Sequence, residues 1–348
     1  MREALIEATA GVATPALVVD GAAMERNIAA AAGFFAGTKA KLRPHFKAHK
    51  CTELMRHQIA AGSTVGVTCA TAWEAEVLAA SGFEDVLVAN QVADPRALGW
   101  LVNAARHARI TVCVDDVRHL ELLDATGERF DVLVEINVGQ DRSGLEPGSG
   151  LLPTLAATRG NLRFRGLQGY EGHAVLKADR EERAGHVAAA AGILSNERSR
   201  LEDAGIAVEL VSGGGTGTYD LAAEAGVLDE VQAGSYVLMD ASYATLGLPF
   251  EQALFCRSTV VSRQGDRVVL DAGLKALSRE YGLPQAEGIA FTSLADEHAT
   301  GTTDLDLKVG DVVLLVPAHV DPTVNLHPAL TVVAEDGSTE RWPVDGRR

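Results

Sequence analysis

From about residue 40 to residue 240, short apolar, β-branched runs alternate with longer stretches rich in Ala, Leu, Glu and Arg. The short runs predict strands, and the longer stretches have the periodicity of amphipathic helices. The expected strands are Leu42–Lys47, Val65–Ala70, Asp85–Asn90, Ile110–Asp115, Val132–Val138, Phe164–Tyr170, Val208–Gly213 and Glu230–Tyr236. The expected helices are Cys51–Ala61, Ala72–Ala80, Pro95–Ala108, Val117–Ala125, Gly150–Thr158, Ala178–Ala204 and Leu221–Ala225.

Strands as apolar as these are expected to be buried on both faces, which indicates a parallel sheet covered by helices. Eight such units in succession are the number that closes a (β/α)8 TIM barrel. An open, doubly wound sheet is the alternative fold, with a glycine-rich turn after its first strand. Because Ala48, His49 and Lys50 follow the first run instead, we expect an α/β protein built on the barrel.

The pattern changes near residue 246 to short strands and Gly/Asp turns, typical of a second, mostly antiparallel β domain. The strands expected in it are Phe255–Ser262, Arg267–Asp271, Val312–Val316 and Ala329–Ala334. An N-terminal run, Ala16–Asp20, is expected to pair with this sheet, and a helix over Gly21–Phe35 is expected to lead into the barrel. The expected domains are therefore residues 21–245 for the barrel, and residues 1–20 plus 246–348 for the β domain.

Composition narrows the classes of partner. The 348 residues include 31 basic and 47 acidic side chains, a net charge of −16, which argues against binding nucleic acid or an anionic membrane surface. We find no signal peptide pattern and no apolar run of the roughly 18 residues that cross a bilayer. The four cysteines have no metal-site spacing, which favours reduced thiols. A soluble, cytoplasmic protein is expected.

In a TIM barrel the reactive residues lie at the carboxyl ends of the strands. Lys47 closes the first expected strand, with His45, His49 and Lys50 as neighbours. A lysine that is crowded by cations and partly desolvated has its neutral amine favoured, which Schiff-base chemistry requires. The alternative interpretation is a solvated basic patch.

Two glycine-containing segments follow the last two expected strands. Gly213 to Gly217 and Gly234-Ser235-Tyr236 combine backbone freedom with hydroxyl groups, which is typical of a phosphate cradle. The loops after strands seven and eight are the usual phosphate pocket of these barrels. A single glycine-rich turn would be weak support, but two at adjacent strand ends, with a lysine on the first strand, predict phosphate binding.

Three further residues follow strands five and six. Arg142 could neutralise an anionic cofactor oxygen, or form a surface ion pair. Tyr170 could stack on a planar ring and His173 could act as a base, although each residue alone is more often structural.

A candidate metal pair lies near the end of the chain. In an extended segment, residues two apart point to the same face, so His319 and Asp321 are expected to converge. One imidazole and one carboxylate suit Mn²⁺, Mg²⁺ or Zn²⁺. A simple His–Asp hydrogen bond in a loop is the alternative.

Taken together, these motifs are specific. Five segments carry the resemblance: Thr14-Pro15, residues 43–50, residues 212–216, residues 271–276 and the His-x-Asp pair. The sequence resembles the D-threonine aldolase / D-serine dehydratase family of fold-type III pyridoxal phosphate enzymes, built like alanine racemase, over nearly the whole chain.

The resemblance implies pyridoxal 5'-phosphate as cofactor, with Lys47 as its Schiff-base lysine. It implies phosphate contacts from Gly215, Thr216, Gly234, Ser235 and Tyr243. It further implies that Arg142 reaches the phenolic oxygen of the cofactor, that Tyr170 lies near its ring, and that His319 and Asp321 bind the metal. A homodimer is also implied, since the β domain of such folds completes the partner's site.

One position separates the activities of this family. Its dehydratases typically carry His-x-Cys with zinc, and its aldolases carry His-x-Asp with manganese or magnesium. Asp321 therefore favours an aldolase that cleaves small D-β-hydroxy-α-amino acids to glycine and an aldehyde, or glyoxylate from a hydroxyaspartate. A dehydratase is the alternative. An amino-acid racemase or a non-catalytic pyridoxal phosphate carrier is less favoured, because neither needs the metal pair.

Overall fold

The computed structural model describes residues 2–158 and 160–348, and these form two compact units. The barrel unit contains Ala31–Lys47 and Gln58–Gly234, with Arg348. The sheet unit contains the chain up to Ala30, together with Ala48–His57 and Ser235–Arg347. Each unit is described by itself.

Eight parallel strands form the described part of the barrel unit, in the order β2-β9-β8-β7-β6-β5-β4-β3. They are β2 (Lys41–Leu42), β3 (Val67–Cys69), β4 (Asp85–Val88), β5 (Arg109–Val114), β6 (Phe130–Glu135), β7 (Leu162–Gly169), β8 (Leu210–Gly213) and β9 (Glu230–Val231). Isolated parallel bridges, Leu42 to Thr64 and His45 to Thr68, join the two ends of this order. The predicted TIM barrel is confirmed.

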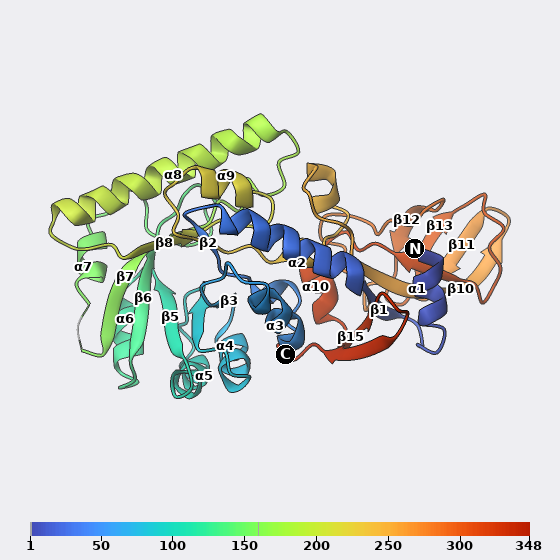
Figure 1. The fold of residues 1–348 in the computed structure, drawn as a ribbon, viewed down its shortest axis with the longest axis horizontal. Coiled ribbons are helices and arrows are strands. Elements are labelled where there is room, and N and C mark those ends of the chain that lie inside the picture. Colours follow the sequence, from blue (N-terminus) through green and yellow to red (C-terminus); the bar gives the residue numbers. More distant parts are fainter. Residues whose placement is uncertain (1, 159) are drawn as a thin grey trace. The chain divides into compact units, whose positions relative to one another are not determined.

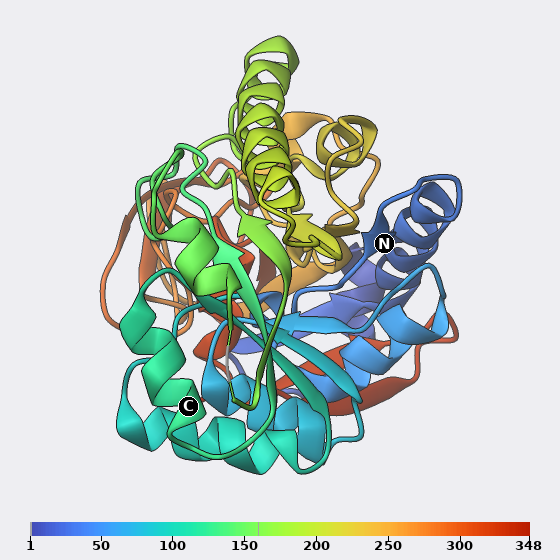
Figure 2. The same ribbon diagram turned by 90° about the vertical axis from the view of Figure 1, so that its left-hand side faces the viewer.

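Helices follow the strands and lie outside them (Figures 1 and 2). They are α4 (Ala72–Ala80), α5 (Pro95–Ala105), α6 (Val117–Asp124), α7 (Leu152–Ala156), α8 (Arg180–Asp203) and α9 (Tyr219–Glu224). Two more helices, α2 (Gly21–Ala36) and α3 (Thr52–Ala60), have residues in both units. Side-chain oxygens of Thr71, Asp94, Asp116 and Asp179 accept backbone N–H groups at the starts of α4, α5, α6 and α8. These caps satisfy helix donors that have no partner within the helix, so they fix where the helices begin.

A buried ion network lies where the barrel order closes. The guanidinium of Arg43, just after β2, lies 2.7 Å from Glu230 at the start of β9 and 3.2 Å from Asp85 at the start of β4. The Arg43 side chain is 3% exposed. Although burial raises the pKa of Asp85, Arg43 and Arg109 hold it below its usual value. These side chains therefore link strands on both sides of the short β2.

The sheet unit contains a second eight-stranded sheet, in the order β12-β13-β11-β10-β1-β15-β16, with β14 paired to β10. Its strands are β1 (Ala16–Asp20), β10 (Leu254–Gln264), β11 (Arg267–Leu270), β12 (Ala290–Leu294), β13 (Ala299–Thr302), β14 (Val312–Leu315), β15 (Ala329–Val333) and β16 (Thr339–Pro343). Strand β1 is antiparallel to β10 and parallel to β15, so the predicted pairing of the N-terminal strand with the C-terminal sheet is confirmed. The mostly antiparallel second domain is also confirmed, whereas the domain limits at residues 20 and 245 stay a prediction.

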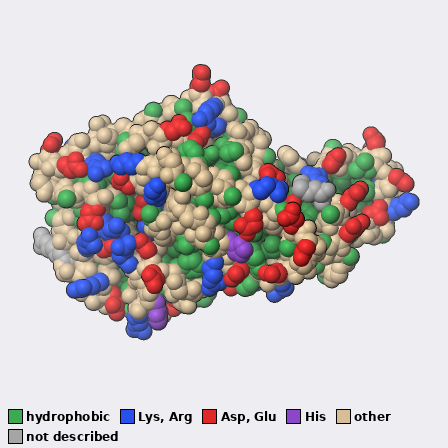
Figure 3. All heavy atoms as spheres, in the orientation of Figure 1, with side chains coloured by type: hydrophobic (Ala, Val, Ile, Leu, Met, Phe, Trp, Pro, Cys, Tyr) green, Lys and Arg blue, Asp and Glu red, His purple; other side chains and the backbone are tan. Residues whose placement is uncertain are grey.

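Short helices complete the sheet unit. They are α1 (Arg2–Ala8), α10 (Val320–Asn325) and the 3-10 turns η2 (Ser235–Val237) and η3 (Tyr243–Leu246). The four cysteines are buried and form no disulfide. Among residues 2–158 and 160–348, we find no helix with the length and apolarity needed to cross a bilayer. Acidic and basic side chains are interspersed over the face in Figure 3.

Candidate active site

Lys47 lies just beyond β2, in the 3-10 turn η1 (Phe46–Ala48). Of the expected strand Leu42–Lys47, only Leu42 lies in β2, and Pro44, which follows two residues later, has no N–H to donate to a longer ladder. Backbone bonds still hold the segment, since the N–H groups of Arg43 and His45 donate to Val231 and Ala233. Lys47 is partly buried, and its backbone N–H donates to His45 Nδ1 over 3.4 Å.

The glycine-rich loop after β8 lies against neighbouring backbone. A Cβ added to Gly213 would be 2.1 Å from the carbonyl oxygen of Gly169, and one at Gly217 would be 1.8 Å from that of Val175. Only glycine can make these approaches, so both glycines are required by packing. Thr216 lies between them and is 2% exposed.

Glu171, which was not among the residues predicted from the sequence, is hydrogen-bonded to this loop. The Thr218 hydroxyl donates to Glu171 Oε1 over 2.6 Å, and the Gly215 N–H donates to Thr218 Oγ1 over 3.3 Å. Burial raises the pKa of the Glu171 carboxyl, while Thr218 and the Gly214 amide lower it. The predicted phosphate contact Gly215 thus has its N–H directed to Thr218.

Three predicted cofactor residues lie together at the ends of β6, β7 and β8. The guanidinium carbon of Arg142 is 5.7 Å from the ring centroid of Tyr170. A Cβ on Gly215 would be 3.2 Å from the same ring. The structure therefore brings Arg142, Tyr170 and Gly215 into one cluster in the barrel unit.

A carboxylate network lies beside Arg142, and the sequence analysis did not single it out. Arg142 Nη2 is 4.0 Å from Glu135 Oε1, and the Gln91 amide donates both to Glu135 and to Asp115 Oδ2, the latter over 3.1 Å. Burial raises the pKa of Glu135, while Gln91 and Arg142 lower it. Glu135 ends the fully buried β6, a position that could have signalled it, but Gln91 carries no such signal.

His173 follows β7 and lies against a second histidine. Its ring centroid is 5.0 Å from that of His186 on α8, and a Cβ on Gly139 would be 3.1 Å from it. Burial, and then His186, lower the pKa of His173, so its imidazole is neutral near pH 7. Within the described residues, His173 Nδ1 is buried without a hydrogen-bond partner. These properties suit a proton acceptor.

The expectation of an extended segment at His319 and Asp321 is wrong, because helix α10 begins at Val320. His319 keeps extended angles as the N-cap residue, and Asp321 lies in the first helical turn. The two side chains still converge, since His319 Nε2 is 3.9 Å from Asp321 Oδ1. The pair therefore lies at the junction between an extended residue and the first helical turn, not in a continuous strand.

Other side chains of the sheet unit hold this pair. Asp240 Oδ2 accepts the Val320 N–H over 2.9 Å, and the Ser235 hydroxyl donates to Asp321 Oδ1 over 3.0 Å. Burial raises the pKa of Asp240 to about 6. Tyr243 is buried, and its N–H donates to Asp240 Oδ1. Ser235, predicted to contact phosphate, is thus bonded to a predicted metal residue, and Gly234 directly precedes it.

Within the described residues, the pair is not part of a larger cluster of metal-binding side chains. Among residues 2–158 and 160–348, we find no group of three or more His, Cys, Asp or Glu side chains arranged to hold a metal ion.

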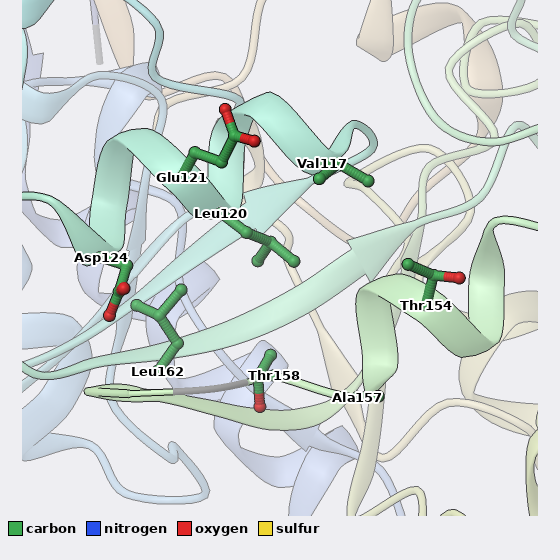
Figure 4. A pocket seen from close by; sticks show the side chains of 8 residues that line it. All are labelled: Val117, Leu120, Glu121, Asp124, Thr154, Ala157, Thr158 and Leu162. Atoms are coloured by element: carbon green, nitrogen blue, oxygen red, sulfur yellow. The ribbon is translucent and has the colours of Figure 1, made fainter.

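A cavity of about 300 Å³ lies between α6, α7 and the start of β7 (Figure 4). Its lining is mixed, with Leu120 and Leu162 beside Glu121 and Asp124, and it contains no predicted site residue.

Comparison with known proteins places this fold in one class. The alanine racemase N-terminal domain family matches residues 19–242, and the putative serine dehydratase domain family matches residues 253–333. Fold and family together define a pyridoxal phosphate enzyme of the alanine racemase type.

The relatives define the family further. D-threonine aldolase of an Arthrobacter species is 39% identical, covering 97% of this chain and 93% of that one. 3-hydroxy-D-aspartate aldolase of Paracoccus denitrificans is 36% identical, covering 96% and 92%. D-threo-3-hydroxyaspartate dehydratase of a Delftia species is 30% identical, covering 94% and 96%.

Among solved structures, D-threonine aldolase from Filomicrobium marinum matches with a TM-score of 0.93 and 38% identity, covering 97% of this chain and 96% of that one. The chain belongs to the D-threonine aldolase family. The predicted family and the predicted enzyme class, a carbon–carbon lyase, are confirmed by these matches.

Proposed function

We propose that the chain is a pyridoxal phosphate- and divalent metal-dependent aldolase. It cleaves D-β-hydroxy-α-amino acids to glycine and an aldehyde, or to glyoxylate where the substrate is a D-3-hydroxyaspartate. The observation that carries this proposal is the convergence of His319 and Asp321, an imidazole and a carboxylate 3.9 Å apart, in a chain that aldolase relatives match over nearly its full length.

The barrel unit suits pyridoxal phosphate. Its glycine-rich loop has no space for a Cβ at Gly213 or Gly217, and it follows β8, the strand end at which such barrels bind phosphate. Lys47 would hold the cofactor carbon, Thr216 the phosphate and Arg142 the phenolic oxygen, with Tyr170 beside the ring. When bound, the cofactor supplies an electron-accepting ring for the pair released when Cα–Cβ breaks.

The pair in the sheet unit suits a divalent cation. Typical metal–ligand distances are about 2.1 Å, so two donors up to about 4.2 Å apart can share one ion. The 3.9 Å between His319 and Asp321 is within that limit. A nitrogen and a carboxylate oxygen, with no thiolate, suit Mn²⁺, Mg²⁺ or Zn²⁺. A cation there would lower the pKa of a hydroxyl that it binds.

His173 is proposed as the base. Its imidazole would take the β-hydroxyl proton. Its lowered pKa keeps the imidazole neutral and ready to accept a proton near pH 7.

Product analysis tests the proposal. Purified protein with pyridoxal phosphate and Mn²⁺ is given D-threonine, D-serine and D-3-hydroxyaspartate in separate reactions. Glycine is expected, whereas a 2-oxo acid with ammonia would indicate the dehydratase alternative, which the Delftia relative supports.

Two further measurements test the assigned groups. A chelator should abolish activity and added Mn²⁺ should restore it, because the proposed reaction requires the metal. A racemase or a cofactor carrier would be indifferent to the chelator. Lys47→Ala should lose the yellow absorbance of the bound cofactor together with turnover. Full turnover in that variant would overturn the role of Lys47.

A homodimer in the cytoplasm also belongs to the proposal. Light scattering behind size-exclusion chromatography measures the mass of the assembly, and the mass of a single chain, 36.6 kDa, would contradict the dimer.

A further inference from the structure

One turn of the sheet unit contacts His319 on two sides. We call residues 279–282 the clamp turn, which closes through a 3.0 Å bond from the Gly282 N–H to the Arg279 carbonyl. Glu280 Oε2 lies 3.0 Å from His319 Nδ1. The Tyr281 ring centroid lies 4.5 Å from the imidazole centroid, at 34° between the planes. One edge and one face of the imidazole are therefore covered.

The contact with Glu280 decides which ring nitrogen can bind a metal. A carboxylate only accepts hydrogen bonds, so the neutral imidazole carries its proton on Nδ1. The lone pair is then on Nε2, the nitrogen that lies 3.9 Å from Asp321 Oδ1. A carboxylate behind a ligating histidine fixes both the tautomer and the orientation of the ring.

A chain of hydrogen bonds ties the clamp turn to α10. The Glu280 N–H donates to the Ser278 hydroxyl, and the Ser278 N–H donates to Thr323 Oγ1 over 3.1 Å. The Thr323 hydroxyl, which is fully buried, donates to the His319 carbonyl over 2.7 Å. The residues that contact His319 and the helix that follows it are thus held as one piece.

Tyr281 has a backbone conformation that is uncommon for its residue type. Its φ is +69°, in the left-handed region, where residues other than Gly, Asn and Asp are strained. The residue is 54% exposed, so burial does not explain the strain. The ring lies against the imidazole of His319.

We propose that Glu280 and Tyr281 are positioning residues that hold His319 ready to bind the divalent cation. Glu280 acts through Nδ1, and Tyr281 acts through the face of the ring. This inference rests on the metal site of the proposed function.

A Mn²⁺ titration of the pyridoxal phosphate-loaded enzyme, followed by calorimetry, tests Glu280. Glu280→Ala should bind Mn²⁺ about 10–100-fold more weakly, the usual effect of losing such a partner. Glu280→Gln should retain most of the affinity, because its amide oxygen still accepts from Nδ1. Wild-type affinity in Glu280→Ala would overturn the role of Glu280.

Glu297→Ala is the matched control. Glu297 is as exposed as Glu280, with 58% against 55% of the side chain accessible, and it pairs with Lys275 in the same unit. Its removal should leave the Mn²⁺ affinity unchanged, and a loss equal to that of Glu280→Ala would mean that any lost surface carboxylate has this effect.

Tyr281→Gly separates positioning from stability. Glycine relieves the left-handed backbone while it removes the ring, so resistance to urea should be equal or greater. The Mn²⁺ affinity should nevertheless fall. An unchanged affinity would overturn the role of the ring.

His319→Ala distinguishes this inference from the function on which it rests. If His319→Ala binds Mn²⁺ as well as the wild type does, the metal site itself is wrong. If His319→Ala loses Mn²⁺ while Glu280→Ala and Tyr281→Gly retain it, only the positioning roles fail.

Discussion

Two glycines of the barrel unit are expected to respond in opposite ways to the same added methyl group. In Gly217→Ala the new Cβ would be 1.8 Å from the Val175 carbonyl oxygen, so the loop must move and pyridoxal phosphate should bind more weakly. Gly192, on the exposed face of α8, has nothing within 4 Å of that position. Gly192→Ala should raise the free energy of unfolding by about 0.5–1 kcal/mol.

Cofactor titration by absorbance and urea unfolding measure the two effects. Unchanged cofactor affinity in Gly217→Ala would contradict a rigid glycine-rich loop.

Thr218 and Glu171 form a buried pair that can be tested by removing one hydroxyl. Thr218→Val keeps the shape of the side chain but removes the donor to Glu171 Oε1. A buried acceptor without its partner costs roughly 1–3 kcal/mol of stability. Thr218→Ser retains the donor, so its free energy of unfolding, measured in urea, should remain near that of the wild type. An equal loss of stability in both variants would assign the effect to packing instead.

At the scale of elements, the regular barrel strands could be predicted and α10 could not. The central barrel strands contain short apolar, β-branched runs, such as residues 110–114 in β5 and residues 132–134 in β6, which can be recognised from the local sequence. Helix α10 contains Pro322, and His319 makes no side-chain cap bond at its start. The Val320 N–H is instead accepted by Asp240, 80 residues earlier in the chain, which no local pattern reveals. The exposed strand β12 was missed for lack of a continuous apolar run.

His327, two residues beyond the end of α10, predicts a pH-dependent stability. Its Nε2 donates to the Ala276 carbonyl, and burial, with a smaller contribution from Arg347, lowers its pKa below 6.5. Below pH 6.5 the unfolded chain therefore binds more protons than the folded one, and stability falls as the pH decreases. The slope from this one group is at most about 1.4 kcal/mol per pH unit.

Urea unfolding at pH 8 and pH 5 tests this expectation. His327→Gln keeps a donor for Ala276 but does not titrate, so its stability should fall less on acidification than that of the wild type. An equal loss of stability between pH 8 and pH 5 in the two proteins would assign the acid sensitivity to other groups.

At the scale of the whole molecule, the sequence predicted site residues that follow recognisable strand ends. It did not predict the side chains that contact them. Arg142, Tyr170 and Gly215 follow three successive strands, and barrel geometry brings them together. Gln91 contacts Glu135 across 44 residues of sequence, and Glu280 contacts His319 across 39. Such pairs depend on the complete fold, and one sequence contains no signal for them.

Arg43 is expected to contribute to the stability of the whole barrel. Its guanidinium is buried between Glu230 and Asp85, on either side of the short β2. Arg43→Ala would leave Glu230 without this buried partner, although Asp85 would keep Arg109, and breaking a buried pair typically costs about 3–5 kcal/mol. Urea unfolding measures the loss. A change below about 1 kcal/mol would show that the backbone bridges close the ring without Arg43.

The position of β1 between β10 and β15 has a consequence during biosynthesis. Ala16 pairs with Arg257, which is translated 241 residues later. At about 5–20 residues per second, the ribosome needs roughly 10–50 s to deliver that partner. For this time a nascent apolar strand has both edges open, which makes it a target for chaperones and for aggregation when translation is slowed.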